Sequence, residues 1–139
     1  MKKMLISFVL FGLTACSTTP VSTKDAILIP DSKVLVDGKK YLNPSKNTGQ
    51  VIVKRDSGIF GSGCATLIYI DSKSVAELDT SEKVIFNLSE GEHFIGAEPS
   101  GICVGGLSEV IANVRVGSVL VFRYGIMGNG NSGIYPTAF

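Results

Sequence analysis

The sequence predicts an all-β fold, an antiparallel β-sandwich of about seven or eight short strands with an Ig-like or transthyretin-like arrangement. Short segments rich in Val, Ile and aromatic residues recur at a spacing of roughly 8–12 residues, which is typical of such sandwiches. Glycines and small polar residues separate these segments, and the chain contains 16 glycines. No window of about 11 residues shows the apolar period of an amphipathic helix.

The strands of this sandwich are expected between residues 49 and 139. Their positions are 51–55, 65–70, 75–78, 84–88, 93–97, 107–116 and 119–126. Val110, Ala112, Val114 and Val116 occupy alternate positions of one segment, so they are expected to face the core together.

Residues 26–48 are expected to form an N-terminal arm or an edge hairpin in front of the sandwich. An Asp37-Gly38 pair stands there between two apolar segments. Asp-Gly is a strong signal for a two-residue hairpin turn, because Gly adopts the positive φ that the turn requires.

The first 15 residues have the organisation of a secretory signal peptide. A basic start at residues 1–3 precedes an apolar segment at residues 4–13. This segment is too short to span a bilayer, which takes about 20 apolar residues. The small and polar residues 16–25 are expected to form a flexible tether that leads to the folded domain.

The sequence LTAC at residues 13–16 resembles the lipobox of bacterial lipoproteins. The resemblance implies that Cys16 takes a diacylglyceryl group, that cleavage falls before it, and that its new amino group is acylated. Two or three acyl chains give stable anchoring. The alternative is an ordinary signal peptide cut after Ala15. Ser17 stands where Asp favours inner-membrane retention in enteric lipoproteins, so it implies the outer membrane, with the domain facing the periplasm.

Residues 49–126 resemble a family of small bacterial lipoproteins built on an uncharacterised β-sandwich domain. The matching stretches are Gly49 with the strand that ends in Arg55, the sequence IYIDSKSVAEL, and the sequence LSEGEHFIG. Ser72 and Glu90 depart from the pattern, where the family often has Gly and Pro, and both lie in expected turns. The resemblance implies a fold, and the family has no settled activity to suggest for this chain.

Two cysteines remain after Cys16, and they are expected to form a disulfide between Cys64 and Cys103. An even number of cysteines in an exported chain favours pairing. Glycines flank both, which lets two backbones approach closely. A closed loop of about 40 residues stabilises a domain by about 4 kcal/mol in the chain-entropy model. Two free thiols or a metal site are the alternatives, although a metal needs more ligands than His93 supplies.

Composition excludes some classes of partner and cofactor. Removal of residues 1–15 takes away Lys2 and Lys3, so the formal charge changes from +1 to −1, which gives no electrostatic basis for nucleic-acid binding. The sequence GNGNSG at residues 128–133 fits a dinucleotide-binding pattern, but only six residues follow it and no helix is predicted there. We therefore expect no cofactor and no metal.

The leading functional hypothesis is a non-enzymatic envelope module that contacts another protein or the cell wall. Its glycine-rich loops are better suited to recognition than to chemistry, and Ile59 and Phe60 are the expected contact residues. The second hypothesis is a hydrolase that uses His93 with Ser57 or Ser62. The third is an accessory lipoprotein for lysis or immunity, encoded by a phage or a secretion cluster.

Overall fold

The computed structural model describes residues 17–139. The proposed signal peptide and Cys16 therefore lie outside the described residues. Within these residues, nine strands form two sheets. Their bounds are β1 (Ile27–Leu28), β2 (Thr48–Arg55), β3 (Thr66–Ile70), β4 (Lys73–Leu78), β5 (Glu82–Ser89), β6 (Gly91–Pro99), β7 (Ser108–Val114), β8 (Val119–Ile126) and β9 (Ser132–Pro136).

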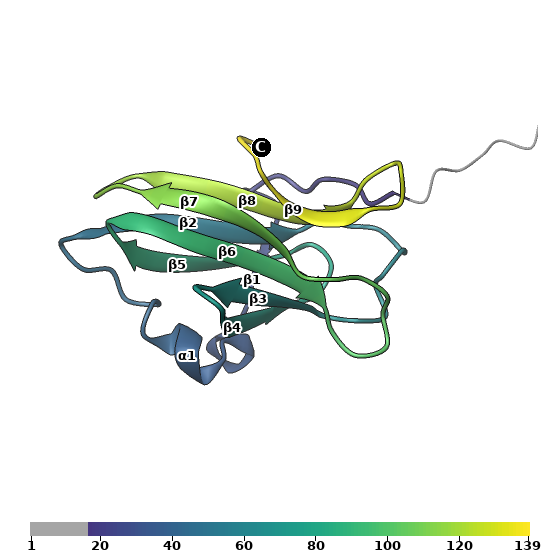
Figure 1. Ribbon diagram of the computed structural model, residues 1–139, viewed down its shortest axis with the longest axis horizontal. Helices are drawn as coiled ribbons and strands as arrows, with labels where there is room; N and C mark the ends of the chain where they lie inside the picture. The colour runs from purple at the N-terminus through teal and green to yellow at the C-terminus, as the bar shows by residue number, and fades with distance from the viewer. Residues whose placement is uncertain (1–16) are drawn as a thin grey trace, which may run out of the picture.

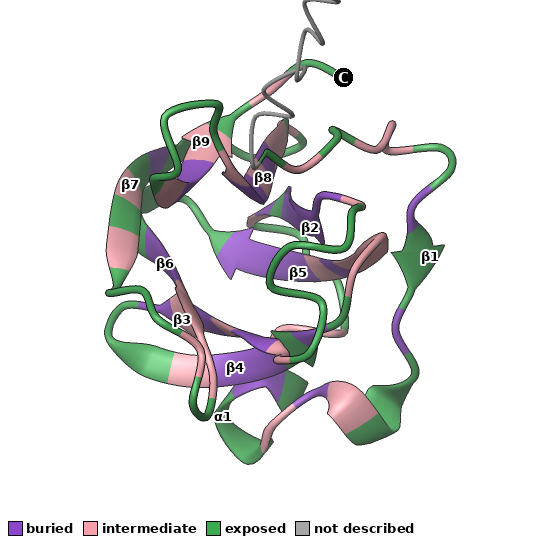
Figure 2. Ribbon diagram, turned by 90° about the vertical axis from the view of Figure 1, so that its right-hand side faces the viewer, coloured by how far each residue is buried: buried purple, intermediate pink, exposed green. Residues whose placement is uncertain are grey.

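The strands are arranged as a β-sandwich, which confirms the predicted fold class. One sheet has the order β1-β5-β2-β8-β9 and the other the order β4-β3-β6-β7. Figure 2 shows that the buried residues, in purple, occur on strands of both sheets. Most pairs are antiparallel, but β2 pairs with β8 in parallel, and so does β1 with β5.

The core follows from the alternation of the strands. Phe86, Ile68, Leu88 and Ile95 are among its largest fully buried side chains. In β7 the burial alternates as expected through Ala112 and Val114. Val116 is half-exposed, contrary to expectation, because β7 ends at Val114 and Val116 lies in the following turn.

The predicted edge hairpin at Asp37-Gly38 is wrong, and the arm is helical there. A 3₁₀ helix (Asp31–Lys33) precedes α1 (Val36–Lys39). Gly38 is required because the arm approaches β4 closely, and not because the chain makes a hairpin turn there. A Cβ at Gly38 would lie 2.2 Å from the carbonyl oxygen of Val75. The amide of Leu35 donates to the same carbonyl over 2.9 Å, so the arm covers the outer edge of β4.

The expectation of a flexible tether is wrong for residues 18–25, which pack against the sandwich. Lys54 of β2 is fully buried beneath them, and its ammonium donates to the carbonyls of Val21 (2.6 Å) and Phe139. Burial lowers the pKa of Lys54. In the described part of the chain no helix is long and apolar enough to cross a membrane.

Candidate functional site

Three glycine-rich loops meet at one end of the sandwich. They connect β2 to β3, β6 to β7, and β8 to β9, and the directions of these strands bring them to the same end (Figure 1). We call residues 57–64, 100–107 and 127–131 the loop end. The segment that begins at Ser17 enters the domain at this end, because the Thr18 amide donates to the carbonyl of Ile126, the last residue of β8.

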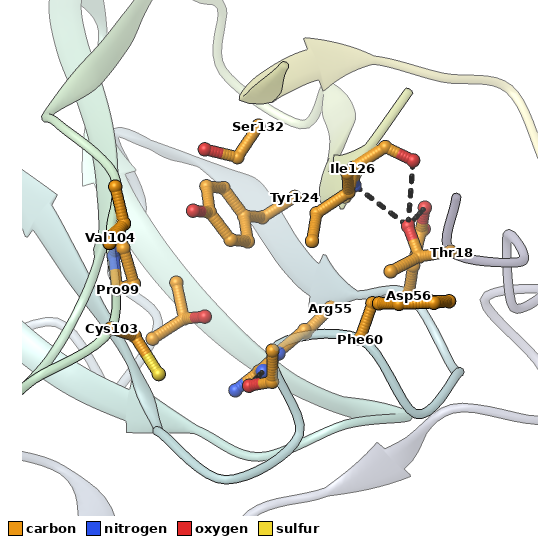
Figure 3. Close-up of a pocket in the computed structure, with 13 residues that line it drawn as sticks. Thr18, Arg55, Asp56, Phe60, Pro99, Cys103, Val104, Tyr124, Ile126 and Ser132 are labelled. Carbon is orange, nitrogen blue, oxygen red and sulfur yellow. Dashed lines mark hydrogen bonds between the residues drawn. The ribbon is translucent and has the colours of Figure 1, made fainter. Parts of the chain in front are cut away.

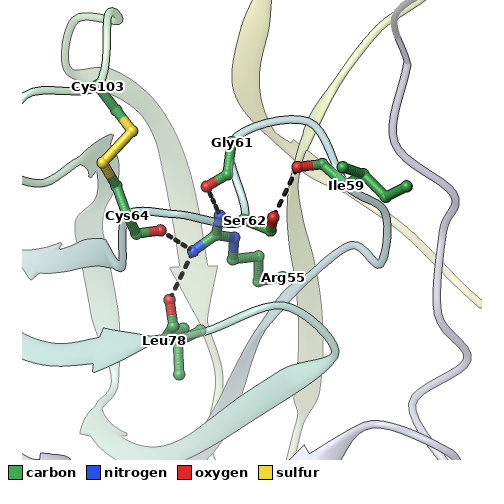
Figure 4. The surroundings of a disulfide bond; sticks show 7 residues. All are labelled: Arg55, Ile59, Gly61, Ser62, Cys64, Leu78 and Cys103. Carbon is green, nitrogen blue, oxygen red and sulfur yellow. Dashed lines mark hydrogen bonds between the residues drawn. A yellow bond between two sulfur atoms is a disulfide. The ribbon is translucent and has the colours of Figure 1, made fainter.

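The predicted disulfide between Cys64 and Cys103 is confirmed and joins two of these loops. The two Cα atoms are 6.2 Å apart, and the cysteines are separated by 39 positions in the sequence (Figure 4). The β2–β3 and β6–β7 loops are therefore fastened together as parts of one surface.

Arg55 holds the β2–β3 loop from inside the domain. Its Nη1 donates to the carbonyls of Cys64 (2.6 Å) and Leu78 (3.0 Å), and its Nη2 donates to the carbonyl of Gly61 (2.6 Å), as Figure 4 shows. Burial lowers the pKa of Arg55. A planar guanidinium suits this task because it presents several donors in a fixed geometry. Sequence reasoning treated Arg55 only as the end of a strand.

Asp56 is the centre of a second network at this end. Its Oδ2 accepts hydrogen bonds from Thr18 Oγ1 (2.9 Å) and from Arg123 Nη1 (2.5 Å). Burial raises the pKa of Asp56, while the contacts with Thr18 and Arg123 oppose that rise. Gly125 makes the approach possible, since a Cβ there would lie 2.0 Å from Asp56 Oδ2.

A cavity of about 40 Å³ lies beneath the loops, between Arg55, Thr66 and Tyr124 (Figure 3). Among the described residues, Asp56 Oδ1 and Thr66 Oγ1 are buried there without a hydrogen-bond partner. A volume of this size accommodates a few water molecules. It is far below the roughly 300–1,000 Å³ of pockets that hold drug-sized ligands.

Large apolar side chains are exposed on the loops above this cavity. The exposed fractions are 87% for Ile59, 98% for Ile102 and 100% for Val104, and Phe60 and Met127 are partly exposed. The sequence predicted Ile59 and Phe60 as contact residues. It missed Ile102 and Val104, although both flank Cys103, and the disulfide places that residue next to the β2–β3 loop.

His93 lies towards the opposite end, and no hydrogen bond joins it to Ser57 or Ser62 within residues 17–139. The hydroxyl of Ser57 donates to the carbonyl of Thr19 (3.2 Å), and that of Ser62 donates to the carbonyl of Ile59 (2.7 Å). These two serines are part of the loop end and not of a histidine site.

The imidazole of His93 is instead held between Asp71 and Ser89. Its Nδ1 lies 2.7 Å from Asp71 Oδ2, and its Nε2 lies 2.9 Å from the carbonyl oxygen of Ser89 and 3.5 Å from its hydroxyl. The nearest neighbours of the two ring nitrogens, a carboxylate and a carbonyl, are hydrogen-bond acceptors. The hydroxyl of Ser89 is the more distant of the two Ser89 groups at Nε2, so the closest contacts of His93 do not form a nucleophile–base pair.

A larger groove of about 440 Å³ lies between the arm and β5. Asp31 is the one ionisable side chain among its lining residues, which include Leu28, Val34 and Asn87. A catalytic site usually combines at least two titratable groups in matched environments. This groove does not bring such a pair together, and among residues 17–139 no cluster of three potential metal ligands occurs.

Comparison of the chain with protein-family models, with curated proteins and with solved structures found no match.

Proposed function

We propose that the protein is a lipid-anchored, non-enzymatic module of the bacterial cell envelope that makes its contacts through the loop end. The lipobox at residues 13–16 supports the anchor on Cys16, and Ser17 supports the outer membrane, with the domain in the periplasm. An envelope protein or the cell wall is the class of partner proposed from the sequence.

One observation carries the contact role, namely the group of exposed apolar side chains on loops that are held rigidly. Scattered single apolar residues are normal on a protein surface, whereas a group of them marks an interaction site. Here Ile59, Ile102 and Val104 stand on two loops joined by a disulfide, and Arg55 fixes one of these loops from below. Contact residues on a rigid support lose little conformational entropy on binding.

The hydrolase alternative has one observation in its favour, the row of Asp71, His93 and Ser89. The carbonyl of Ser89 lies closer to His93 Nε2 than the hydroxyl does, and this supports a structural role for the row. The role as a lysis or immunity accessory stays a prediction from the sequence.

The two leading functions make opposite predictions for two variants. In cells that lack the gene, the double variant Ile59→Asp, Phe60→Asp should fail to restore the wild-type phenotype, although it folds and reaches the membrane. His93→Ala should restore it. Loss of function in His93→Ala at unchanged stability, with a functional loop variant, would support the hydrolase.

A further inference from the structure

We propose that the loop end lies on the lipid bilayer that holds Cys16, with Ile59, Phe60, Ile102 and Val104 in the interfacial region. This inference rests on the proposed lipid anchor and names the partner of the loop end. It is carried by three independent features, namely the position of Thr18, the distribution of charge, and the exposed apolar side chains.

Thr18 fixes the distance between the anchor and the loops. Its amide donates to the carbonyl of Ile126 (3.0 Å), its hydroxyl donates to Asp56, and the Ile126 amide donates back to that hydroxyl (2.8 Å). Thr19 and Ser57 exchange two further backbone hydrogen bonds of 2.9 Å. Only Ser17 lies between Cys16 and Thr18. The two residue steps from Cys16 to Thr18 span about 7 Å at most.

This short reach leaves no room for a folded partner between the loop end and the membrane. Even one α-helix is about 10–12 Å in diameter. While Thr18 stays bound to Ile126 and Asp56, an acylated Cys16 brings the β8–β9 loop to the bilayer surface. A bilayer is therefore favoured over a protein as the partner of this surface.

The distribution of charge agrees with a membrane-facing end. Residues 57–64, 100–107 and 127–131 contain no Asp, Glu, Lys or Arg. The four turns at the other end each carry a charged residue, and these are Lys46, Asp71, Glu90 and Arg115. The remaining turn near the loop end carries Asp79, which is paired with Lys33 over 2.6 Å. Uncharged loops approach the interface without the cost of desolvating ions.

The exposed apolar side chains supply a favourable contact. Ile59 stands on one side of the disulfide, and Ile102 and Val104 stand on the other, each almost fully exposed. Apolar side chains on a peripheral protein enter the boundary between headgroups and acyl chains to a depth of about 5–10 Å. Two loops held together by Cys64 and Cys103 present these side chains as one surface.

Tryptophan fluorescence tests the orientation, because the chain contains no Trp and each substitution adds a single probe. The mature lipidated protein carrying Ile59→Trp or Ile102→Trp is placed in vesicles of phosphatidylethanolamine and phosphatidylglycerol, with or without dibrominated acyl chains. The control is Val116→Trp, in the turn between β7 and β8. It lies about 25 Å from the loop end, since β8 has eight residues that rise about 3.3 Å each.

We expect brominated lipid to reduce the fluorescence of both loop variants about twofold and to leave the control unchanged, because bromine quenches only probes that reach the acyl boundary. Ile102→Trp lies in an open loop position, so it keeps the test valid if Ile59→Trp does not fold. Equal quenching of loop and control probes, or none in either, would overturn the proposal.

Flotation and the mass of the N-terminal peptide distinguish a failure of the proposed orientation from a failure of the proposed lipid anchor. Protein that carries lipid on Cys16 and floats with the vesicles, but whose loop tryptophans are not quenched, contradicts the orientation alone. Protein without lipid that does not float contradicts the proposed anchor, and the orientation with it.

Discussion

The hydroxyl of Thr18 donates a hydrogen bond to Asp56 Oδ2 over 2.9 Å, which ties the start of the described chain to the end of β2. The same hydroxyl accepts the amide of Ile126 from β8. Thr18 thus joins two neighbouring strands of one sheet at the loop end. If Cys16 is acylated, this contact decides whether a flexible linker joins the domain to the membrane or the domain is held close to it.

Replacement of Thr18 tests the strength of this attachment. Thr18→Val keeps the shape of the side chain but removes one donor to Asp56 and one acceptor for the Ile126 amide. A partly buried polar group left without its partner costs about 1–3 kcal/mol. We expect the free energy of unfolding of the soluble domain, measured with denaturant, to fall by about that amount.

Thr19→Val is the matched control, because Thr19 is exposed and uses only its backbone in the hydrogen bonds found within residues 17–139. Its effect should stay within about 0.5 kcal/mol, as is usual for surface positions. Equal effects of the two substitutions would show that the Thr18 hydroxyl does not hold the segment.

Gly125 offers an independent way to disturb the same network. A Cβ at this position would lie 2.0 Å from Asp56 Oδ2 and 2.8 Å from Thr18 Oγ1, so Gly125→Ala forces both groups apart. We expect a loss of about 1–3 kcal/mol, the usual cost of overpacking. Faster proteolysis of residues 17–25 should accompany it.

The control for this substitution is Gly128→Ala, since a Cβ there meets no atom within 4 Å. Its unfolding free energy and its rate of proteolysis should match those of the wild type. If residues 17–25 of Gly125→Ala resisted proteolysis as well as those of the wild type, the segment would be held by contacts other than the Asp56 network.

The disulfide should contribute strongly to stability. Cys64 and Cys103 are 39 positions apart, and a closed loop of this length corresponds to about 4 kcal/mol in the chain-entropy model. We expect the Cys64→Ala, Cys103→Ala double variant to lose about this much, and no more than either single variant. Mass spectrometry of protein from the periplasm should show the bridge, and two freely alkylated thiols would refute it.

The contact between Asp71 and His93 should make stability depend on pH in acid. Burial raises the pKa of Asp71, but the hydrogen bonds from His93 and from the amide of Phe94 outweigh this, so the pKa lies below its usual 3.8. A carboxyl with a lowered pKa stabilises the fold fully above its unfolded pKa and loses this effect as the pH falls through the folded pKa.

Asp71→Asn should therefore destabilise the domain at pH 6 by up to about 1 kcal/mol, the usual range for an exposed pair. The difference from the wild type should shrink below pH 3.8, the usual value for this carboxyl. Asn tolerates the left-handed backbone at this position, where φ is 48°. Glu92→Gln, in the strand that contains His93, serves as the control. An equal loss of unfolding free energy in Asp71→Asn at pH 6 and at pH 3 would contradict the contact between Asp71 and His93.

The sequence predicted the features that depend on local pattern or on simple counting. Alternation in segments such as β7 identified the strands, and a pair of cysteines in a chain expected to be exported indicated the disulfide. The parallel pairing of β2 with β8 was not predicted, because strand pairs distant in the sequence leave no local signal.

Part of the candidate site could not be predicted from the sequence, for the same reason. Thr18 lies in a small, polar segment with the composition of a linker, and its partners Asp56 and Ile126 are 38 and 108 positions away. Two weak signals were present. Gly125 interrupts a strand, which often marks close backbone approach, and Lys54 stands inside an apolar strand, which indicates a covered outer face.

The mass of the N-terminal peptide from membrane-purified protein decides whether the domain is lipid-anchored, and both the anchor and the orientation depend on this chemistry of Cys16. We expect a mature chain that begins at Cys16 and carries a diacylglyceryl group, and a Cys16→Ser variant that carries none and is not processed. An unmodified Cys16 in the mature protein, or normal processing and alkali-resistant membrane association of Cys16→Ser, would contradict it.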